Sequence, residues 1–420
     1  MFLFFICRVV MGRLRILTCR VSTATVAVIL FTLTLILQPV VIIHNYSSVT
    51  RSVYKPTDIA HIDIISRNIT LTYGSNFNPD LSKEHSNLWT FNNTHRIAVN
   101  SSSSTGADDL EYPLEVDMPK LVGQVLSNLT VPFHPINDPQ FSMLITEYQK
   151  CNNVLLETGE PPELLVLIKS APSNLARRDA IRLTWGNDLC WGGRRVIHLF
   201  LLGTVSSNDP LIYMLKNESD VYHDIIQQDF LDHYYNNTYK IMFGINWVVN
   251  YCPSVPIIMF VDDDYFIYPK NVIAYIEGLS RELRELLISG YVWYNAKPVR
   301  KQGRNSNKWS VDRSEYPLNI YPPYVAAGNF FLSMHLARKL NVAIHYTKYL
   351  RFDDVYIGII LKKLLYVPMH LKKVYTFHTV NLNSSDIYEM ISSHGFGDPV
   401  SQFSLWDRLK CSQFCVQSFA

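Results

Sequence analysis

The sequence carries almost no net charge. Its 38 lysine and arginine residues nearly balance its 36 aspartate and glutamate residues, so the formal net charge is only +2. Proteins that bind nucleic acid or acidic surfaces through long-range electrostatics usually have a clear basic excess. The composition therefore gives no indication of such a partner, and specific chemistry has to be sought in local groups of residues.

Glycine-rich phosphate loops and paired cysteines are also absent. Neither GxGxxG nor GxxxxGK occurs, although these are two common patterns whose backbone amides bind nucleotide phosphates. The seven cysteines include no CxxC pair, so their spacing predicts no zinc site. What the chain does have is 420 residues of which 48% are hydrophobic, enough for one large folded domain or two smaller ones.

An uncharged segment near the N-terminus, residues 21–43 (VSTATVAVILFTLTLILQPVVII), is long enough to cross a bilayer as a helix. Positive charges precede it, at Arg8, Arg13, Arg15 and Arg20. The positive-inside rule then predicts a type II membrane protein, with a cytoplasmic tail at residues 1–20 and a lumenal C-terminal part. The alternative is a cleaved signal peptide, whose apolar core is usually only ~7–15 residues long.

Potential N-glycosylation sites agree with this topology, because all of them follow the apolar segment. They begin at Asn45, Asn68, Asn92, Asn100, Asn128, Asn217, Asn236 and Asn383. Five cysteines fall in the same oxidising compartment, and this odd number predicts one or two disulfides with a thiol left over. They are Cys151, Cys190, Cys252, Cys411 and Cys415, and their spacing leaves the pairing open.

Composition divides the lumenal part in two. Residues 44–155 contain five of the eight acceptor sites, the run NSSSSTGADD and no sustained hydrophobic period, which predicts a flexible stem. Residues 156–420 alternate short apolar runs with helical patterns, which is typical of an α/β domain with a largely parallel sheet. Within it, strands are predicted at 163–170, 194–203 and 256–264.

Three consecutive carboxylates, Asp262, Asp263 and Asp264, end the last of these strands. In an open α/β sheet, the carboxyl ends of the strands form the edge where ligands bind. Adjacent carboxylates repel each other unless a cation compensates them, and carboxylate oxygens suit Mg²⁺ or Mn²⁺, which keep positions open for substrate phosphates. The alternative is a solvated acidic turn.

Further polar residues gain meaning only in combination. Asp353 and Asp354 begin an amphipathic helix, where acids also occur simply as caps. His378 lies in YTFHTV and could be a metal ligand or a satisfied core histidine. Arg178 and Arg182 share a helix face near the end of the first strand, where they could receive a diphosphate or form a solvated basic face.

Taken together, these residues resemble the Golgi β-1,3-galactosyltransferases and β-1,3-N-acetylglucosaminyltransferases of glycosyltransferase family 31. The resemblance rests on six motifs in the family's order: RRDAIRLTWG (177–186), FLLG (200–203), ESDVYHDIIQQDFLDHYYNNTYK (218–240), CPSVPIIMFVDDDYFI (252–267), YPPYVAAGNFFLS (321–333) and DDVYIG (353–358). It implies a GT-A fold, which is a Rossmann-like α/β domain with a mixed, largely parallel sheet, preceded by one transmembrane helix and a stem. It also implies an inverting, Mn²⁺-dependent transfer from a UDP-sugar.

The resemblance assigns roles to individual residues. Asp264 and His378 are expected to bind Mn²⁺, and Asp354 is expected to be the catalytic base. The residues expected to bind the donor are Arg178, Arg182, Asp262, Asp263 and Gly328. Those expected to bind the acceptor are Tyr321 and Trp309.

The match departs from the family pattern at three places. Asp353 replaces a Glu, Phe260 replaces a frequent Lys, and Asn329-Phe330 replaces Gly-Tyr. Changes at these places bear on sugar specificity more than on catalysis.

We therefore expect a Golgi membrane β-1,3-hexosyltransferase that uses UDP-galactose and acts on a glycoprotein or glycolipid. UDP-GlcNAc is the alternative donor, and the sequence does not distinguish UDP-GalNAc from either. The rival interpretations are an inactive lumenal binding protein with the same fold and a metal phosphodiesterase, which usually needs more His and Asp ligands than this sequence offers.

Overall fold

The computed structural model describes residues 116–207, 209–300 and 307–416. The predicted cytoplasmic tail and membrane anchor, residues 1–43, lie outside the described residues. Within the described ranges, no helix combines the length and the apolar character that a membrane span needs.

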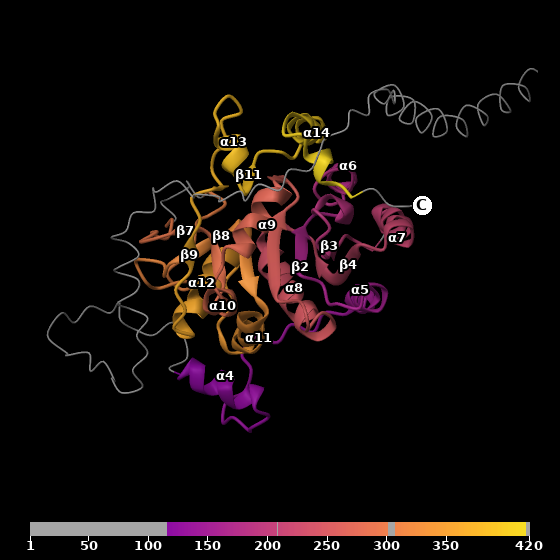
Figure 1. Cartoon of the computed structure of the whole chain (residues 1–420). Helices are drawn as coiled ribbons and strands as arrows, with labels where there is room; N and C mark the ends of the chain where they lie inside the picture. Colours follow the sequence, from indigo (N-terminus) through magenta and orange to yellow (C-terminus); the bar gives the residue numbers. More distant parts are fainter. Residues whose placement is uncertain (1–115, 208, 301–306, 417–420) are drawn as a thin grey trace, which may run out of the picture. The chain divides into compact units, whose positions relative to one another are not determined.

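An eight-stranded mixed sheet forms the centre of the described domain (Figure 1). In spatial order its strands are β1 (Met143–Ile145), β4 (Ile225–Leu231), β3 (Val196–Thr204), β2 (Leu164–Lys169), β5 (Ile257–Asp262), β8 (Tyr324–Ser333), β7 (Ile288–Trp293) and β9 (Met369–His370). The central strands β4, β3, β2 and β5 are parallel, whereas β1 and β8 pair antiparallel with their neighbours. The predicted α/β class with a mixed sheet is therefore confirmed.

Helices cover both faces of this sheet. The helices of the described residues are α4 (Met118–Leu126), α5 (Lys150–Thr158), α6 (Leu175–Arg182), α7 (Leu211–Tyr222), α8 (Asn237–Tyr251), α9 (Pro269–Glu277), α10 (Arg281–Glu285), α11 (Met334–Ala343), α12 (Asp353–Lys363), α13 (Asp386–Glu389) and α14 (Pro399–Arg408). Alternate residues of β2 enter two different cores: Leu165 and Leu167 pack with α8, α11 and α12, and Val166 packs with α6, α9 and α14. Burial on both faces explains why β2 is an unbroken apolar run, as parallel strands usually are.

A second, three-stranded sheet places the acidic turn. It consists of β10 (Val374–Tyr375), β11 (Ser392–His394) and β6 (Tyr265–Ile267). Because β6 begins directly after Asp264, its antiparallel pairing with β11 brings a distant part of the chain, around His394, to the carboxyl end of β5.

The disulfides resolve the cysteine pairing that the sequence left open. Cys151 is bonded to Cys252, and Cys190 is bonded to Cys415. Cys411 remains a buried thiol, so the prediction of one or two disulfides with one cysteine left over is confirmed.

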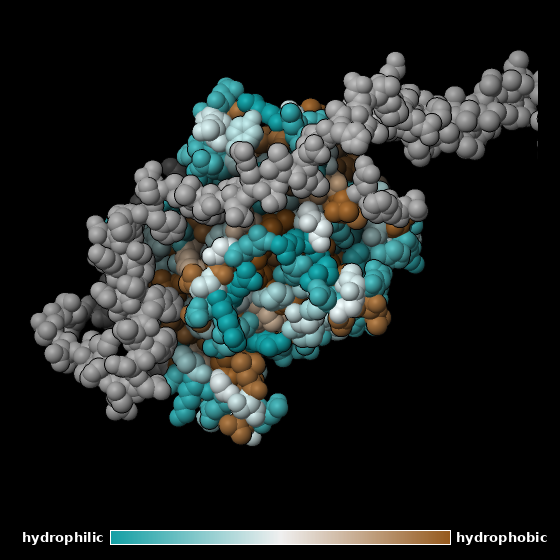
Figure 2. Space-filling model, in the orientation of Figure 1, coloured by the Kyte–Doolittle hydropathy of each residue, from teal (hydrophilic) through white to brown (hydrophobic). Residues whose placement is uncertain are grey.

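The folded domain begins earlier than the predicted stem boundary at residue 155. In α4, Met118, Leu121 and Val122 are at most 2% exposed and belong to the main core. Strand β1 pairs with β4, and α5 carries the disulfide-bonded Cys151. Residues 116–155 are therefore part of the domain. The buried residues of α4, Met118, Leu121 and Val122, follow a helical spacing, but a helix of 9 residues is too short to form a sustained hydrophobic period in the sequence. Hydrophobic residues also remain at the surface around α4 (Figure 2), including Leu126 and Leu129.

Candidate active site

The carboxyl ends of β2 and β5 carry the first ion pair of the site. Lys169 ends β2, Asp262 ends β5, and the two residues are partners in the parallel register. Nζ of Lys169 lies 2.8 Å from Oδ1 of Asp262 and 3.1 Å from Oδ2 of Asp353, at the start of α12. Burial alone lowers the pKa of Lys169, but these two carboxylates hold it above its ordinary value.

Lys169 was not predicted from the sequence. The available signal was the same one that identified Asp262, namely a charged residue that ends an otherwise apolar strand. Its cation joins the acidic turn to α12, so the two acidic motifs that the sequence suggested separately are brought to one place.

Asp263 points its carboxylate into the protein. It is 5% exposed, and it accepts hydrogen bonds from Ser170 Oγ (2.7 Å), Asn174 Nδ2 (2.8 Å) and Arg177 Nη1 (2.8 Å). These bonds tie the acidic turn to the loop between β2 and α6 and to α6 itself. Asp263 therefore shapes the site through these bonds, and its expected contact with the donor stays a prediction.

Asp264 faces His394. Nε2 of His394 lies 3.3 Å from Oδ2 of Asp264, and Oδ1 of Asp264 is buried without a hydrogen-bond partner among the described residues. A buried carboxylate oxygen with no donor suits a cation, and imidazole is a common companion ligand. These two side chains therefore fit a divalent metal ion.

His378, the expected metal ligand, is not the histidine that contacts Asp264. Its side chain is exposed, on the segment that follows β10. Among the described residues there is also no cluster of three or more His, Cys, Asp or Glu residues arranged to hold a metal. A metal at Asp264 and His394 would take its remaining ligands from substrate phosphates and water, as Mg²⁺ and Mn²⁺ commonly do.

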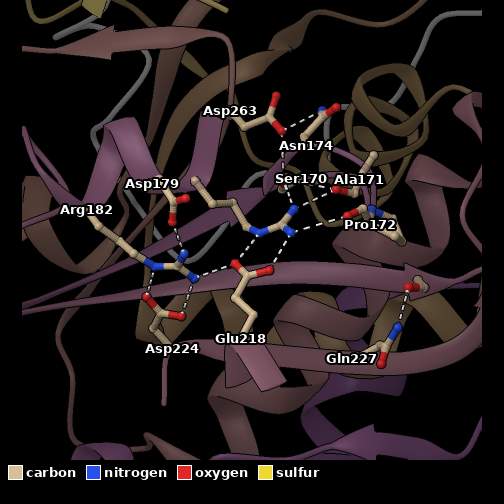
Figure 3. A network of polar contacts seen from close by, with 12 residues as sticks. Ser170, Ala171, Pro172, Asn174, Asp179, Arg182, Glu218, Asp224, Gln227 and Asp263 are labelled. Carbon is tan, nitrogen blue, oxygen red and sulfur yellow. Dashed lines mark hydrogen bonds and ion pairs between the residues drawn. The ribbon is translucent and has the colours of Figure 1, made fainter. Parts of the chain in front are cut away.

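The predicted arginine pair lies in a buried network instead of facing a ligand (Figure 3). Arg178 is fully buried, and its five N–H groups are all used: two donate to Glu218, and the others donate to Ser170, Ala171 and Pro172. Its guanidinium therefore fixes the loop after β2 and has no donor left for a diphosphate.

Arg182 belongs to the same network. It donates to Asp179, Glu218 and Asp224. Burial alone raises the pKa of Glu218, but Arg178 and Arg182 together hold it below the ordinary value. Both arginines thus fix α6 to Glu218 of α7, and neither is bonded to the acidic turn in this network. The arginine bonded to the acidic turn is Arg177.

Asp354 stands in the first turn of α12 and is partly buried. Its Oδ1 accepts from the backbone amide of Val355 at 2.8 Å, and among the described residues no side chain donates to it. Burial and the neighbouring charge of Asp353 raise the pKa of Asp354 to about 7. A carboxylate with this pKa is well suited to accept a proton near neutral pH.

Gly328 of β8 lies against Tyr265, the residue that follows the acidic turn. A Cβ atom added at this position would come within 2.0 Å of the hydroxyl of Tyr265. The ring of Tyr265 in turn lies 5.5 Å from the ring of His394, centroid to centroid. Gly328 is therefore required for Tyr265 to pack beside the proposed metal pair.

Two of the three departures from the family pattern lie in the core, and the third, Asp353, is the partner of Lys169 described above. Phe260 and Phe330 are partners in the β5–β8 register, and their buried rings stack at 5.0 Å. Asn329 is also fully buried; it donates to the carbonyl of Phe260 and accepts from Ser392 Oγ. Phe260 and Phe330 thus pack against each other, and Asn329 links β5, β8 and β11.

The two expected acceptor residues differ in exposure. Tyr321 is 7% exposed, and its ring packs between those of Tyr316 and Tyr324. Trp309 is 51% exposed, and its indole nitrogen donates to the hydroxyl of Tyr234 at 3.2 Å. Of these two residues only Trp309 exposes a ring face to a ligand, while Tyr321 is packed among tyrosine rings.

The sequence of this chain is similar to those of known proteins. The family profile described as Galactosyltransferase matches residues 176–372. The β-1,3-galactosyltransferase brn of Drosophila melanogaster is 36% identical over 257 residues, which cover 61% of this chain and 77% of that protein. β-1,3-Galactosyltransferase 2 of Mus musculus is 33% identical over 66% of this chain and 64% of its own length.

A relative with a different donor matches over a similar share of the chain. UDP-GalNAc:β-1,3-N-acetylgalactosaminyltransferase 1 of Rattus norvegicus is 31% identical, over 63% of this chain and 78% of that protein. A solved galactosyltransferase in complex with donor and acceptor sugar analogues covers 60% of this chain and 95% of its own, but its TM-score of 0.31 and 10% identity are too low to carry an argument. On the sequence matches, the chain belongs to the galactosyltransferase family that contains these β-1,3-glycosyltransferases.

Proposed function

We propose that this protein transfers a hexose from a UDP-sugar to the 3-hydroxyl of an acceptor sugar with inversion, which produces a β-1,3 linkage. The observation that carries the proposal is the position of Asp354. It is a carboxylate with a pKa raised to about 7, and Lys169 ties its helix to the acidic turn through Asp353 and Asp262. A proton acceptor and a candidate cation site therefore lie at the same edge of the sheet, at the carboxyl ends of β2 and β5.

In the proposed reaction, Asp354 accepts the proton of the acceptor 3-hydroxyl while that oxygen bonds to the anomeric carbon of the donor. The bond from this carbon to the diphosphate breaks, and UDP leaves on the opposite face. Asp264 and His394 would hold Mn²⁺, which supplies neutralisation of the charge that develops on the diphosphate. Lys169 keeps Asp262 and α12 in position, because its cation is bonded to both.

Galactose is the donor sugar we favour, since two of the relatives described above, at 36% and 33% identity, are β-1,3-galactosyltransferases. N-acetylglucosamine and N-acetylgalactosamine are the alternatives, and the latter is the sugar named for another relative. The acceptor would be a glycan on a glycoprotein or glycolipid. We further propose a type II Golgi membrane location, with the apolar segment at residues 21–43 as the anchor.

The test is transfer by the full chain in detergent. UDP-galactose, UDP-GlcNAc and UDP-GalNAc would each be supplied with p-nitrophenyl β-galactoside and p-nitrophenyl β-N-acetylglucosaminide, in Mn²⁺ and in EDTA. We expect Mn²⁺-dependent product with a β-1,3 linkage from one donor, identified by NMR. An inactive binding protein would bind UDP and release no product with any pair.

A further inference from the structure

Two exposed aromatic side chains form a platform that the proposed reaction has not yet used. Tyr234, in the 3₁₀ helix Tyr234–Asn236, is 43% exposed, and Trp309, in the β7–β8 connection, is 51% exposed. The indole nitrogen of Trp309 donates to the hydroxyl of Tyr234 at 3.2 Å. We refer to these two residues as the aromatic platform.

Lys308 orders the platform. Its Nζ lies 4.9 Å from the ring centroid of Tyr234 and 4.8 Å from that of Trp309. A cation held against two aromatic rings limits the rotation of both. Less ordering is then left to occur when a ligand binds, which favours affinity.

One arginine holds the platform next to Asp354. Arg351 stands just before α12, and its guanidinium covers the ring of Tyr235 at 4.9 Å and donates to the carbonyl of Ser310. Tyr235 follows Tyr234, and Ser310 follows Trp309. Arg351 therefore fastens both segments of the platform to the start of the helix that carries the proposed base.

Electrostatics agree with this placement. Burial is the largest cause of the raised pKa of Tyr234, and the carboxylates of Asp353, Asp354 and Asp262 raise it further, although the bond from Trp309 lowers it. The phenol hydroxyl is thus within the field of the acidic site. Since this hydroxyl accepts from Trp309, its own proton remains available to a ligand.

We propose that Tyr234 is a further acceptor-binding residue, which donates a hydrogen bond to a hydroxyl of the acceptor sugar, while Trp309, whose acceptor role the family resemblance already implies, packs against the apolar face of the pyranose ring. This inference rests on the proposed function and adds Tyr234 to it as an acceptor-binding residue. Exposed aromatic rings beside a few directed polar groups are the surface that a sugar requires, because each pyranose has an apolar C–H face and polar edges. The platform selects the orientation in which the accepting hydroxyl faces Asp354.

The test separates acceptor binding from donor binding in the full chain. Tyr234→Phe removes only the phenol hydroxyl that would donate the hydrogen bond to the acceptor. Trp309→Ala removes the aromatic face, and Trp309→Phe restores part of it. Tyr213→Phe is the matched control, because Tyr213 is 76% exposed on α7, away from the acidic site. The readouts are the acceptor KM for the two p-nitrophenyl glycosides, the UDP-galactose KM, and the slow hydrolysis of UDP-galactose without acceptor.

We expect the acceptor KM to rise about 5- to 10-fold in Tyr234→Phe, the effect of one hydrogen bond, and further in Trp309→Ala, with partial recovery in Trp309→Phe. Donor KM and donor hydrolysis should match those of the parent and of Tyr213→Phe. An unchanged acceptor KM in both Tyr234→Phe and Trp309→Ala would overturn the inference while leaving the proposed function standing.

Saturation-transfer NMR of the same glycosides in the presence of UDP and Mn²⁺ keeps the two questions apart. If the parent transfers no sugar but binds the glycosides, and Trp309→Ala does not bind them, the proposed function is contradicted and the platform is supported. A parent whose glycoside signals are unaffected by either substitution would contradict the platform whatever the transfer rate.

Discussion

His394 and Asp264 are brought together by strand pairing: β11 runs antiparallel to β6, so His394 lies opposite Tyr265, the residue after Asp264. Their side chains approach to 3.3 Å. The neighbouring Asp263 accepts hydrogen bonds from Ser170 and Arg177. Asp264, in contrast, has a buried oxygen without a hydrogen-bond partner among the described residues. A cation at this pair would offset the repulsion within the acidic turn.

The first prediction concerns this pair. In His394→Ala and in Asp264→Ala, Mn²⁺-dependent binding of UDP should weaken by at least about 10-fold, because each change removes a metal ligand. Calorimetric titration of UDP with and without Mn²⁺ measures the effect. His378→Ala is the matched control and should bind UDP as the parent does. If His378→Ala lost the Mn²⁺ dependence and His394→Ala kept it, our assignment of the metal ligand would be incorrect.

The location of the site could be predicted from the sequence, but part of its ligand set could not. An apolar strand that ends in three carboxylates is a local pattern, and parallel strands place such ends along one edge. The partner histidine depends on the register between β6 and β11, which are far apart in the chain. No local pattern encodes that register, so the sequence alone did not suggest His394, and the expected role of His378 stays a prediction.

The arginine pair illustrates the same limit. The spacing of Arg178 and Arg182 correctly placed them together near the end of β2, and the structure confirms that they interact with one partner. That partner, Glu218, lies on α7, and its packing against α6 is a tertiary contact that helical periodicity does not reveal. Arg178 and Arg182 are therefore held in a buried ion-pair network, whereas the side chain of the neighbouring Arg177 forms an ion pair with Asp263 in the acidic turn.

The second prediction is the pH dependence of transfer. The pKa of Asp354 is raised to about 7, so the carboxyl is protonated and inactive as a base below this pH and becomes ionised as the pH rises. We expect kcat to increase with pH through about 7. In Asp353→Asn the neighbouring negative charge is gone, so the pKa of Asp354 falls and the rise should move to lower pH.

The same measurement in Asp354→Asn tests the base itself. Transfer should fall by roughly 10²–10⁴, the usual contribution of a positioned general base, and the rise through pH 7 should disappear. Mn²⁺-dependent UDP binding should be retained, because the metal pair is intact. Transfer at the parental rate by this variant would exclude Asp354 as the base.

The third prediction concerns Lys169. Lys169→Met leaves the carboxylates of Asp262 and Asp353 without their shared cation, and removing one partner of a buried ion pair costs about 3–5 kcal/mol. For a domain of this size, we expect the midpoint of thermal unfolding to fall by roughly 6 °C or more. Lys216→Met is the control, because Lys216 is exposed on α7 and surface substitutions usually change stability by less than about 0.5 kcal/mol. Equal melting temperatures for the two variants would show that the Lys169 bridge is not a stabilising element.

The last prediction concerns where the folded domain begins. A chain that starts at residue 116 retains α4, β1 and α5, whereas one that starts at residue 156, the boundary predicted from composition, loses α4 and β1 and breaks α5. The second truncation uncovers the apolar surface beneath Met118, Leu121 and Val122. It also removes the strand paired with β4 and the partner of Cys252.

Each of these losses destabilises the domain independently. Loss of a native disulfide alone costs about 2–5 kcal/mol, and the buried indole of Trp247 loses its acceptor, the carbonyl of Thr146. We therefore expect the chain from residue 116 to be soluble, to unfold cooperatively and to bind UDP in Mn²⁺, and the chain from residue 156 to aggregate. A Cys151→Ser, Cys252→Ser variant of the longer chain separates the disulfide from the packing, and it should fold with a lower melting temperature. Equal solubility, melting temperature and UDP binding for the two truncated chains would instead place residues 116–155 outside the folding unit, as composition alone suggested.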